Sequence, residues 1–355
     1  MTVVALGVPA LRRPLPPAPG DGPLVDSFGR IATDLRVSLT DLCNLRCTYC
    51  MPAEGLDWMP GDQKLRPDEL VRLLRIAVTR LGITNVRFTG GEPLVVPHLE
   101  DVVAATASLR PRPEIALTTN GVGLAQRSTG LKAAGLDRVN VSLDTVDAAH
   151  FAAITRRDRL ADVLAGLRAA NAAGLRPVKV NAVLDPDTGL EDAVALLRFC
   201  LEHDYQLRII EQMPLDAGHS WRRDRTIAAA DVLGALQRHF TLTPDSAPRG
   251  SAPAALWQVL SPSGEGVIGK VGIIASVSQA FCSACDRTRL TADGQVRNCL
   301  FAAEETDLRA LLRGGGDDDA LEAAWRAAMW TKAAGHGINE PDFVQPDRPM
   351  SAIGG

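Results

Sequence analysis

Short apolar runs alternate with longer Ala- and Leu-rich segments from Arg30 to about Ile210. This alternation is typical of strand–helix units around a parallel sheet, because a helix carries the chain from the end of one strand to the start of the next. One such helix is predicted at residues 67–81, where Pro67 begins an acidic first turn. Six units are too few to close an eight-stranded barrel. We therefore expect an α/β fold with an incomplete (β/α)6 barrel of the TIM type, on strands at 35–40, 85–89, 115–119, 138–143, 178–183 and 207–210.

The regular alternation ends near residue 213. Helices are predicted near 227–240 and 307–332, with a Pro-, Gly- and Ser-rich passage at 244–253 and strand-like segments after it. These differences indicate a second domain. We expect a disordered, proline-rich leader at 1–25, a partial barrel at 26–225, a smaller C-terminal α+β domain at 226–340 and a tail at 341–355 that ends in Gly-Gly.

Composition limits the classes of partner that this chain can bind. Of its 355 residues 46% are hydrophobic, which is enough for a large core. The formal net charge is −4, so there is no broad basic field for nucleic acid. No apolar run approaches the ~20 residues that span a bilayer, and no secretion signal begins the chain, so we expect a cytoplasmic protein without membrane contact. A small anionic substrate would need a few aimed arginines and lysines.

Three cysteines, Cys43, Cys47 and Cys50, lie close together in a short run that follows the first predicted strand. From such a loop three thiolates can converge on one [4Fe–4S] cluster and leave its fourth iron open for chemistry. A disulfide framework is typical of small secreted chains rather than of a chain this long. We therefore interpret the three thiols as cluster ligands in a reducing compartment.

A second set of three cysteines, Cys282, Cys285 and Cys299, lies in the predicted C-terminal domain. A structural zinc site would need a fourth ligand, and no histidine lies within this segment. A second cluster with an open iron is favoured. For the chain as a whole, the non-enzyme alternative is an iron–sulfur electron carrier or a zinc-stabilised interaction protein. The remaining cysteine, Cys200, is interpreted as a core residue, and the six scattered histidines as surface or core residues.

The first cysteine run, Cys-x3-Cys-x2-Cys with Tyr49 before its last cysteine, resembles the signature of the radical S-adenosylmethionine (SAM) family. Two cysteine sets in one chain, the second followed by Arg287 and Arg289, resemble one group within it, the GTP 3',8-cyclase family of molybdenum cofactor biosynthesis. The resemblance runs from about residue 26 to residue 355. It rests also on Gly29-Arg30, Asp34-Leu-Arg-Val-Ser38, Arg87-Phe-Thr-Gly-Gly-Glu-Pro93, Leu117-Thr-Thr-Asn-Gly121, Asn140-Val-Ser-Leu-Asp144, Lys179-Val-Asn181, Ser276-Val-Ser-Gln-Ala-Phe-Cys282 and the terminal Gly-Gly.

The resemblance implies two [4Fe–4S] clusters, with SAM as a further cofactor and GTP as substrate. The first set would bind and cleave SAM, and the second would bind the guanine of GTP through its open iron. The expected product is 3',8-cyclo-7,8-dihydro-GTP, which a cyclic pyranopterin monophosphate synthase uses next. Expected partners also include an electron donor such as flavodoxin or ferredoxin, with the enzyme a monomer or homodimer. The alternative is another radical SAM enzyme with an auxiliary cluster and a different substrate.

The resemblance also implies roles for single residues. SAM would contact Tyr49, Gly91, Ser142 and Met213. GTP would contact Arg36, Arg87, Thr118, Lys179, Arg208, Arg287 and Arg289. A triphosphate needs aimed cations, and buried ones without a carboxylate should meet a ligand. The catalytic group comprises the first three cysteines with Arg287, Arg289, Gly354 and Gly355, the last two entering the active site as the end of the tail. Asp286 departs from the family pattern by adding a negative charge there.

Overall fold

The computed structural model describes residues 16–264 and 266–354. Its strands form a single 12-stranded sheet, in the order β12-β11-β10-β1-β2-β3-β4-β5-β6-β9-β8-β7. Strands β1 to β6 are parallel neighbours in chain order, which confirms the six predicted strands to within two residues at each end. They are β1 (Asp34–Ser38), β2 (Asn85–Thr89), β3 (Glu114–Thr119), β4 (Arg138–Ser142), β5 (Lys179–Val183) and β6 (Gln206–Ile210).

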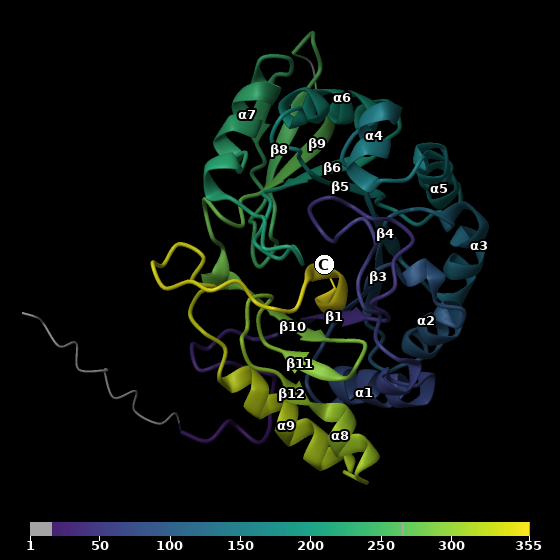
Figure 1. Ribbon diagram of the computed structural model, residues 1–355, viewed down its shortest axis with the longest axis vertical. Coiled ribbons are helices and arrows are strands. Elements are labelled where there is room, and N and C mark those ends of the chain that lie inside the picture. The colour runs from purple at the N-terminus through teal and green to yellow at the C-terminus, as the bar shows by residue number, and fades with distance from the viewer. Residues whose placement is uncertain (1–15, 265, 355) are drawn as a thin grey trace, which may run out of the picture.

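The sequence of each strand explains its two faces. In β1, Leu35 and Val37 are fully buried, whereas Asp34 and Arg36, which alternate with them, are half-buried. Because side chains alternate across a strand, the apolar set packs against the helices and the polar set points to the inner side. Figure 1 shows the helices on the outside of the arc of strands. They are α1 (Pro67–Thr79), α2 (Leu99–Ala107), α3 (Leu124–Ala134), α4 (Ala148–Thr155), α5 (Leu160–Ala172) and α6 (Gly189–Glu202).

The C-terminal part of the chain adds strands to both edges of this parallel sheet. On one edge, β9 (Val267–Ile274) pairs in parallel with β6, and on the other β10 (Arg287–Leu290) pairs in parallel with β1. The boundary expected at residue 225 therefore does not separate two sheets. Antiparallel strands extend the edges further: β7 (Leu242–Pro244), β8 (Ala255–Leu260), β11 (Gln295–Arg297) and β12 (Thr306–Asp307).

The C-terminal helices are α7 (Ala229–Gln237), α8 (Leu308–Arg313), α9 (Asp318–Trp330) and α10 (Met350–Ile353). The helical character expected at 307–332 is confirmed as two helices, α8 and α9, because three consecutive glycines at 314–316 interrupt it. Asp317 then caps α9, its side chain accepting from the backbone N–H of Ala320. Figure 1 shows α8 and α9 beside α1, and ion pairs from Arg72 and Arg75 to Asp318 join α1 to α9.

Part of the expected disordered leader has defined contacts. Leu24 is fully buried, and its backbone N–H donates to the carbonyl of Leu81 at 3.1 Å. The Arg326 guanidinium on α9 donates to the carbonyl of Gly22 at 2.8 Å. Residues 16–25 therefore lie against the body of the protein, which corrects the expectation for them. Residues 1–15 lie outside the described part of the chain.

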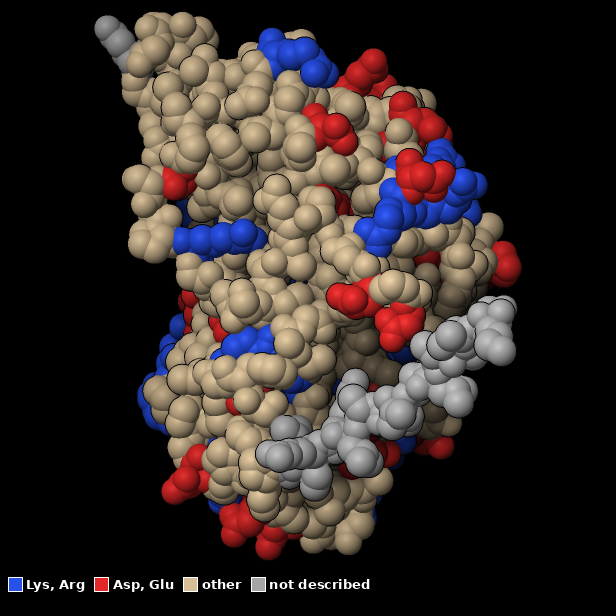
Figure 2. Space-filling model, turned by 90° about the vertical axis from the view of Figure 1, so that its left-hand side faces the viewer, with Lys and Arg blue, Asp and Glu red and all other residues tan. Residues whose placement is uncertain are grey.

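Charges of both signs are interspersed over the face drawn in Figure 2, and no field of one sign covers it. Among the described helices, none combines the length and the apolar character that crossing a bilayer requires.

Trp325 supplies a test of how α9 is attached to the sheet. Its side chain is fully buried, and its indole Nε1 donates to Thr288 Oγ1 on β10 at 3.1 Å. Trp325→Ala should lower the free energy of unfolding by about 3–5 kcal/mol, because it opens a cavity and leaves the Thr288 hydroxyl without a partner. Urea denaturation followed by circular dichroism would measure this. Val344→Ala, at a side chain that is 82% exposed, is the control and should change little; equal effects would contradict the packing role.

Candidate active site

A cavity of about 690 Å³ lies inside the arc of strands. Residues from β1 to β6, from β10 and from the second cysteine region line it, so it brings together most of the predicted site residues. Those that line it are Arg36, Tyr49, Cys50, Arg87, Thr118, Ser142, Lys179, Arg208, Met213, Cys282, Cys285, Arg287, Arg289 and Cys299. Cys43, Cys47, Gly91 and Gly354 are not in this lining, and Gly355 is outside the described residues.

Three arginines form a row across adjacent strands. In the sheet register Arg36 on β1 is opposite Arg87 on β2 and also opposite Arg289 on β10. Neighbouring residues of this kind lie about 5 Å apart at their Cβ atoms, so three like charges share a small buried volume. We name Arg36, Arg87 and Arg289 the arginine row. Such a row is unfavourable unless an anion lies among the guanidiniums.

The protein itself supplies little negative charge to this row. Asp34 is the nearest carboxylate, with its oxygens 3.7 Å from Arg36 Nε and 4.0 Å from an Arg87 Nη. Burial disfavours ionisation of Asp34, but the surrounding arginines outweigh it and hold the pKa of the carboxyl below its usual value. The Nε atoms of Arg36 and Arg87 are buried without a hydrogen-bond partner. Unpaired buried donors of this kind indicate a polyanionic ligand.

Two further cations face the cavity from β5 and β6. Burial, followed by the charges of Arg138 and Arg208, lowers the pKa of Lys179 to about 7. Burial and Arg138 likewise lower the pKa of Arg208 to about 10. No described carboxylate forms an ion pair with either side chain, whereas Arg138 is paired with Glu114. The charged forms of Lys179 and Arg208 therefore depend on a ligand for full stabilisation.

The loop that carries the first cysteine set is held by the Gly-Gly-Glu segment after β2. The backbone N–H of Gly91 donates to the carbonyl of Thr40, and that of Glu92 to the carbonyl of Leu42, both at 2.7 Å. A Cβ atom on Gly91 would lie 2.3 Å from the carbonyl oxygens of both Asp41 and Leu42. Only glycine permits this approach. Close packing against the cysteine loop therefore explains why residue 91 is a glycine. The expected contact of Gly91 with SAM stays a prediction.

Polar groups follow the strands near the first cysteine set. The Tyr49 hydroxyl donates to Asp144 at 2.7 Å, and Asp144 also accepts from the backbone N–H of Val183 at 2.9 Å. Burial raises the pKa of Cys50 to about 12, with Cys43 adding to the effect, and burial also raises the pKa of Cys47 well above its usual value. Buried thiols of this kind favour ionisation when they bind a metal centre.

The second cysteine set has a different electrostatic environment. Cys282, Cys285 and Cys299 line the cavity from the segment that precedes β10 and the turn that follows β11. Burial opposes ionisation of Cys285, but Lys332 and then Arg287 outweigh it and lower the pKa of this thiol below its usual value.

Both cysteine sets offer the thiol ligands that iron–sulfur clusters require. All six thiols are free and partly exposed. Cys50 and the second set border one shared cavity. Among the described residues, no three His, Cys, Asp or Glu side chains are arranged around a single metal ion. Three thiolates around a larger cluster are the chemistry that such sets suit.

The C-terminal tail reaches the arginine row. An Arg289 Nη donates to the carbonyl of Gly354 at 2.5 Å. Gly354 has φ +85°, and a Cβ atom there would lie 2.7 Å from Thr89 Cγ2. The tail is held upstream by Arg348, whose guanidinium donates to both carboxylate oxygens of Asp293 at 2.8 and 2.9 Å. Figure 1 shows this segment, in yellow, running into the centre of the arc of strands.

Several residues at the cavity were missed or misjudged from the sequence. Arg138, Asn140 and Asn181 line it, and their alternate spacing with Ser142 or Lys179 on predicted strands was the signal that could have found them. His336, interpreted as a surface or core residue, also lines the cavity; its Nε2 is 2.9 Å from the Ser276 carbonyl.

Two other residues were open to interpretation from the sequence. Asp286 accepts from Thr33 Oγ1 at 3.0 Å and borders the cavity, so the extra negative charge is anchored at the site. Cys200 is fully buried on α6, which confirms it as a core residue.

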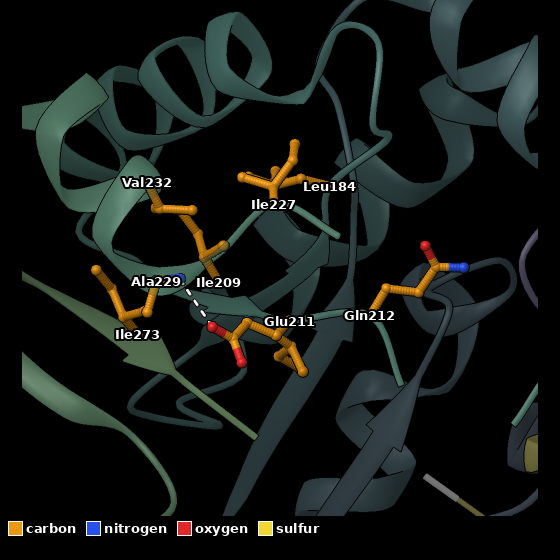
Figure 3. A pocket seen from close by; sticks show the side chains of 9 residues that line it. Leu184, Ile209, Glu211, Gln212, Ile227, Ala229, Val232 and Ile273 are labelled. Atoms are coloured by element: carbon orange, nitrogen blue, oxygen red, sulfur yellow. Dashed lines mark hydrogen bonds between the residues drawn. The ribbon is translucent and has the colours of Figure 1, made fainter. Parts of the chain in front are cut away.

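A second cavity, drawn in Figure 3, has a volume of only about 10 Å³ and lies between β6, β9 and α7. Glu211 at its edge accepts from the backbone N–H of Ala229 at 2.8 Å and from that of Val277 at 2.7 Å. Its other lining is mostly aliphatic, as at Ile209 and Val232. This space is a packing gap beside a carboxylate that fastens α7 to the sheet.

Comparison with known proteins agrees with this arrangement. Residues 37–200 match the model of the Radical SAM superfamily, and residues 205–338 match that of Molybdenum Cofactor Synthesis C. Among solved structures, Streptococcus suis SuiB has a similar fold, with a TM-score of 0.57 and 14% identity over 90% of this chain and 76% of that chain. The form of SuiB bound to S-adenosylmethionine has a TM-score of 0.54 and 16% identity over 90% and 74% of the two chains. The barrel thus defines a radical SAM fold.

Curated relatives narrow this class. A GTP 3',8-cyclase of Mycobacterium sp. (strain KMS) is 78% identical over 355 residues, which is 100% of both chains. A GTP 3',8-cyclase of Mycolicibacterium smegmatis is 74% identical over 362 residues, and GTP 3',8-cyclase 2 of Mycobacterium tuberculosis is 73% identical over 361, each over 100% of both chains. The chain belongs to the GTP 3',8-cyclase family.

Lys179 should take up a proton when a nucleoside triphosphate binds. Its pKa of about 7 should rise beside the anion, so at pH 8 a largely neutral amine becomes charged. Affinity should fall as the pH rises above 7, by at most about tenfold per pH unit for one linked proton. Anaerobic titration calorimetry with GTP in buffers of different ionisation enthalpy would measure the uptake. Lys179→Met should lower it by up to one proton; uptake equal to that of the parent would contradict the assignment.

Proposed function

We propose that this chain is a radical SAM GTP 3',8-cyclase. It converts GTP to (8S)-3',8-cyclo-7,8-dihydroguanosine 5'-triphosphate with release of 5'-deoxyadenosine and methionine, the first step of molybdenum cofactor biosynthesis. The family supports this reaction. Within the molecule, one observation carries it furthest: a single cavity is lined by a cysteine of the first set, by all three cysteines of the second set and by the arginine row, in which the Nε atoms of Arg36 and Arg87 have no hydrogen-bond partner.

The cofactors are SAM and two [4Fe–4S] clusters, held by Cys43, Cys47 and Cys50 and by Cys282, Cys285 and Cys299. When bound, SAM and the first cluster supply a 5'-deoxyadenosyl radical that removes the 3' hydrogen of the substrate ribose. The side chains that orient SAM are Tyr49, Ser142 and Met213, which line the cavity. Gly91, beside the cysteine loop, completes the proposed SAM contacts.

The cations of the cavity bind the triphosphate. Arg36, Arg87 and Arg289 present guanidiniums that lack sufficient carboxylates, and planar guanidiniums suit phosphate oxygens. Lys179 and Arg208 face the same space from β5 and β6, and Arg287 and Thr118 complete the predicted contacts. Since these groups surround a buried volume, they hold the substrate in one orientation, which selects the hydrogen that is removed.

The second cysteine set binds the guanine through an open iron of its cluster. Its place in the lining of the same cavity supports this assignment, because base and triphosphate must be held at once. Gly354 closes the site: its carbonyl accepts from Arg289, and its backbone fits beside Thr89 where a side chain would collide. We assign Gly355 to the same catalytic group. The tail therefore orders the arginine row for turnover.

A reducing compartment suits a protein whose six thiols hold clusters, which supports a cytoplasmic location. The first cluster needs an external electron, and flavodoxin or ferredoxin is the class of donor that we propose. The product passes to a cyclic pyranopterin monophosphate synthase. The enzyme acts as a monomer or a homodimer.

Anaerobic turnover tests the function directly. Reconstituted protein would be given dithionite and SAM with GTP, with ATP or with no nucleotide, and 5'-deoxyadenosine and new nucleotides would be quantified by mass spectrometry. We expect GTP-dependent deoxyadenosine with an equal amount of cyclised product. Deoxyadenosine formed equally in all three samples would contradict GTP as the substrate, and none from a cluster-loaded sample would contradict the radical mechanism.

Variants of the two cysteine sets separate their roles in the same assay. Cys43→Ala should abolish SAM cleavage, whereas Cys299→Ala should retain some uncoupled cleavage and give no cyclised nucleotide. Cys200→Ala, in the core and away from the cavity, is the matched control and should keep both activities. Full product from Cys299→Ala would show that the second set does not bind the substrate.

Removal of Gly354 and Gly355 should stop productive turnover while both clusters remain. The Gly354 carbonyl accepts from Arg289, so its loss frees that guanidinium from its position. Iron content and the cluster absorption spectrum should match those of the parent, with product reduced at least tenfold, equivalent to about 1.4 kcal/mol of lost transition-state stabilisation. Unchanged product formation would count against a role for the tail.

A further inference from the structure

Lys332 lies buried beside the second cysteine set, just after α9. Its side chain belongs to a residue that is 3% exposed. The ammonium donates to the carbonyl of Arg287 at 2.7 Å and lies 3.3 Å from the sulfur of Cys285 and 3.4 Å from the carbonyl of the same cysteine. A lysine in this place therefore contacts a cluster ligand through an N–H···S hydrogen bond.

Nothing in the described part of the protein neutralises this ammonium with a carboxylate, since Lys332 forms no ion pair there. Arg30 provides the contrast. It also braces the second set, donating to the carbonyl of Cys282 at 2.7 Å, but its Nε lies 2.5 Å from Asp26. A buried ammonium without a counterion is costly. The polar partners of Lys332 are thus two carbonyls and the sulfur of Cys285. Arg287, with an Nη 3.8 Å from the same sulfur, adds to the positive field.

The first cysteine set has the opposite environment. Asp144 and Glu92 are buried near it, and their hydrogen-bond donors are neutral: the Tyr49 hydroxyl at 2.7 Å for Asp144, and the Thr119 hydroxyl at 2.6 Å for Glu92. The side-chain donor to the Cys43 sulfur is an uncharged amide, Asn120 Nδ2, at 3.8 Å. The cation Arg46 donates to the carbonyl of Cys43 at 2.7 Å and not to its sulfur. Cationic hydrogen bonding to a ligand sulfur is therefore a property of the second set alone among the described residues.

We propose that Lys332 is a positioning residue of the second cysteine set: its N–H···S hydrogen bond to Cys285 raises the reduction potential of the cluster bound there. This inference rests on the proposed function, in which the second set holds a [4Fe–4S] cluster. Reduction adds one electron to that cluster, and a fixed cation that donates to a ligand sulfur stabilises the added negative charge. The cluster beside Lys332 accepts an electron more readily than it would beside a neutral side chain.

The potential of the second cluster can be measured by itself. The full-length chain with Cys43→Ala, Cys47→Ala and Cys50→Ala leaves the second set as the cluster site. Dithionite titration with viologen mediators, followed by electron paramagnetic resonance, gives its midpoint potential. In that background Lys332→Gln should shift the potential to a more negative value, and Lys332→Arg should restore it because the charge is kept. An unchanged potential in Lys332→Gln would overturn the proposal.

Controls separate charge from packing. Lys270→Gln removes a lysine that is paired with Asp245 at 2.5 Å, and it should leave the potential at the parent value. Should Lys332→Gln fail to retain its cluster, iron content decides: retention in Lys332→Arg and loss in Lys332→Met would support a need for the charge. Loss in both would overturn the proposal in favour of a packing role.

The two proposals fail in different ways. A background variant that binds no iron at the second set would contradict the proposed second cluster, and the inference about Lys332 would fall with it. A background variant with an intact cluster whose potential ignores the charge at residue 332 would overturn only the inference, and the cyclase function would stand.

Discussion

The crowding of guanidiniums across β10, β1 and β2 is the constraint on which the rest of the site depends. Parallel pairing in register forces Arg36, Arg87 and Arg289 to be neighbours, and one carboxylate, Asp34, is too little to balance them. The opposite faces of these strands pack against the helices, and this burial of apolar side chains offsets the repulsion among the arginines. The charges that line the cavity are therefore balanced only when a polyanion binds, and the strands hold the cations in place for it.

The two halves of the chain build this arrangement together. The barrel strands contribute Arg36, Arg87, Lys179 and Arg208, while the C-terminal part contributes Arg289 by adding β10 to the open edge at β1. The same insertion places Cys285 two positions before β10 begins. A site assembled from a shared sheet has less freedom to open than one between two separate domains, because backbone hydrogen bonds cross the junction on both edges.

Much of this was predictable from the sequence, and the exceptions have physical reasons. The six strands followed from short apolar runs that alternate with Ala- and Leu-rich helical segments, and the cysteine spacings indicated both cluster sites. The joining of β9 and β10 to the sheet edges depends on pairing between segments far apart in the chain, which local patterns do not carry. The places of Lys332 and His336 at the site could not be predicted from neighbouring residues. Lys332 contacts a sulfur and His336 a carbonyl that a distant segment contributes. The break between α8 and α9 could have been read from three consecutive glycines.

The pairing of β1 with β10 also sets the separation of the two cysteine sets. Cys285 lies just before the first residue of β10, whereas the first cysteine set comes after the last residue of β1, and the two strands run in the same direction. The two sets are thus at opposite ends of a strand pair, and the five residues of β1 span about 17 Å at ~3.3 Å each. Strand length, which changes only by whole residues and at the cost of register, thereby sets the size of molecule that can reach both ends at once.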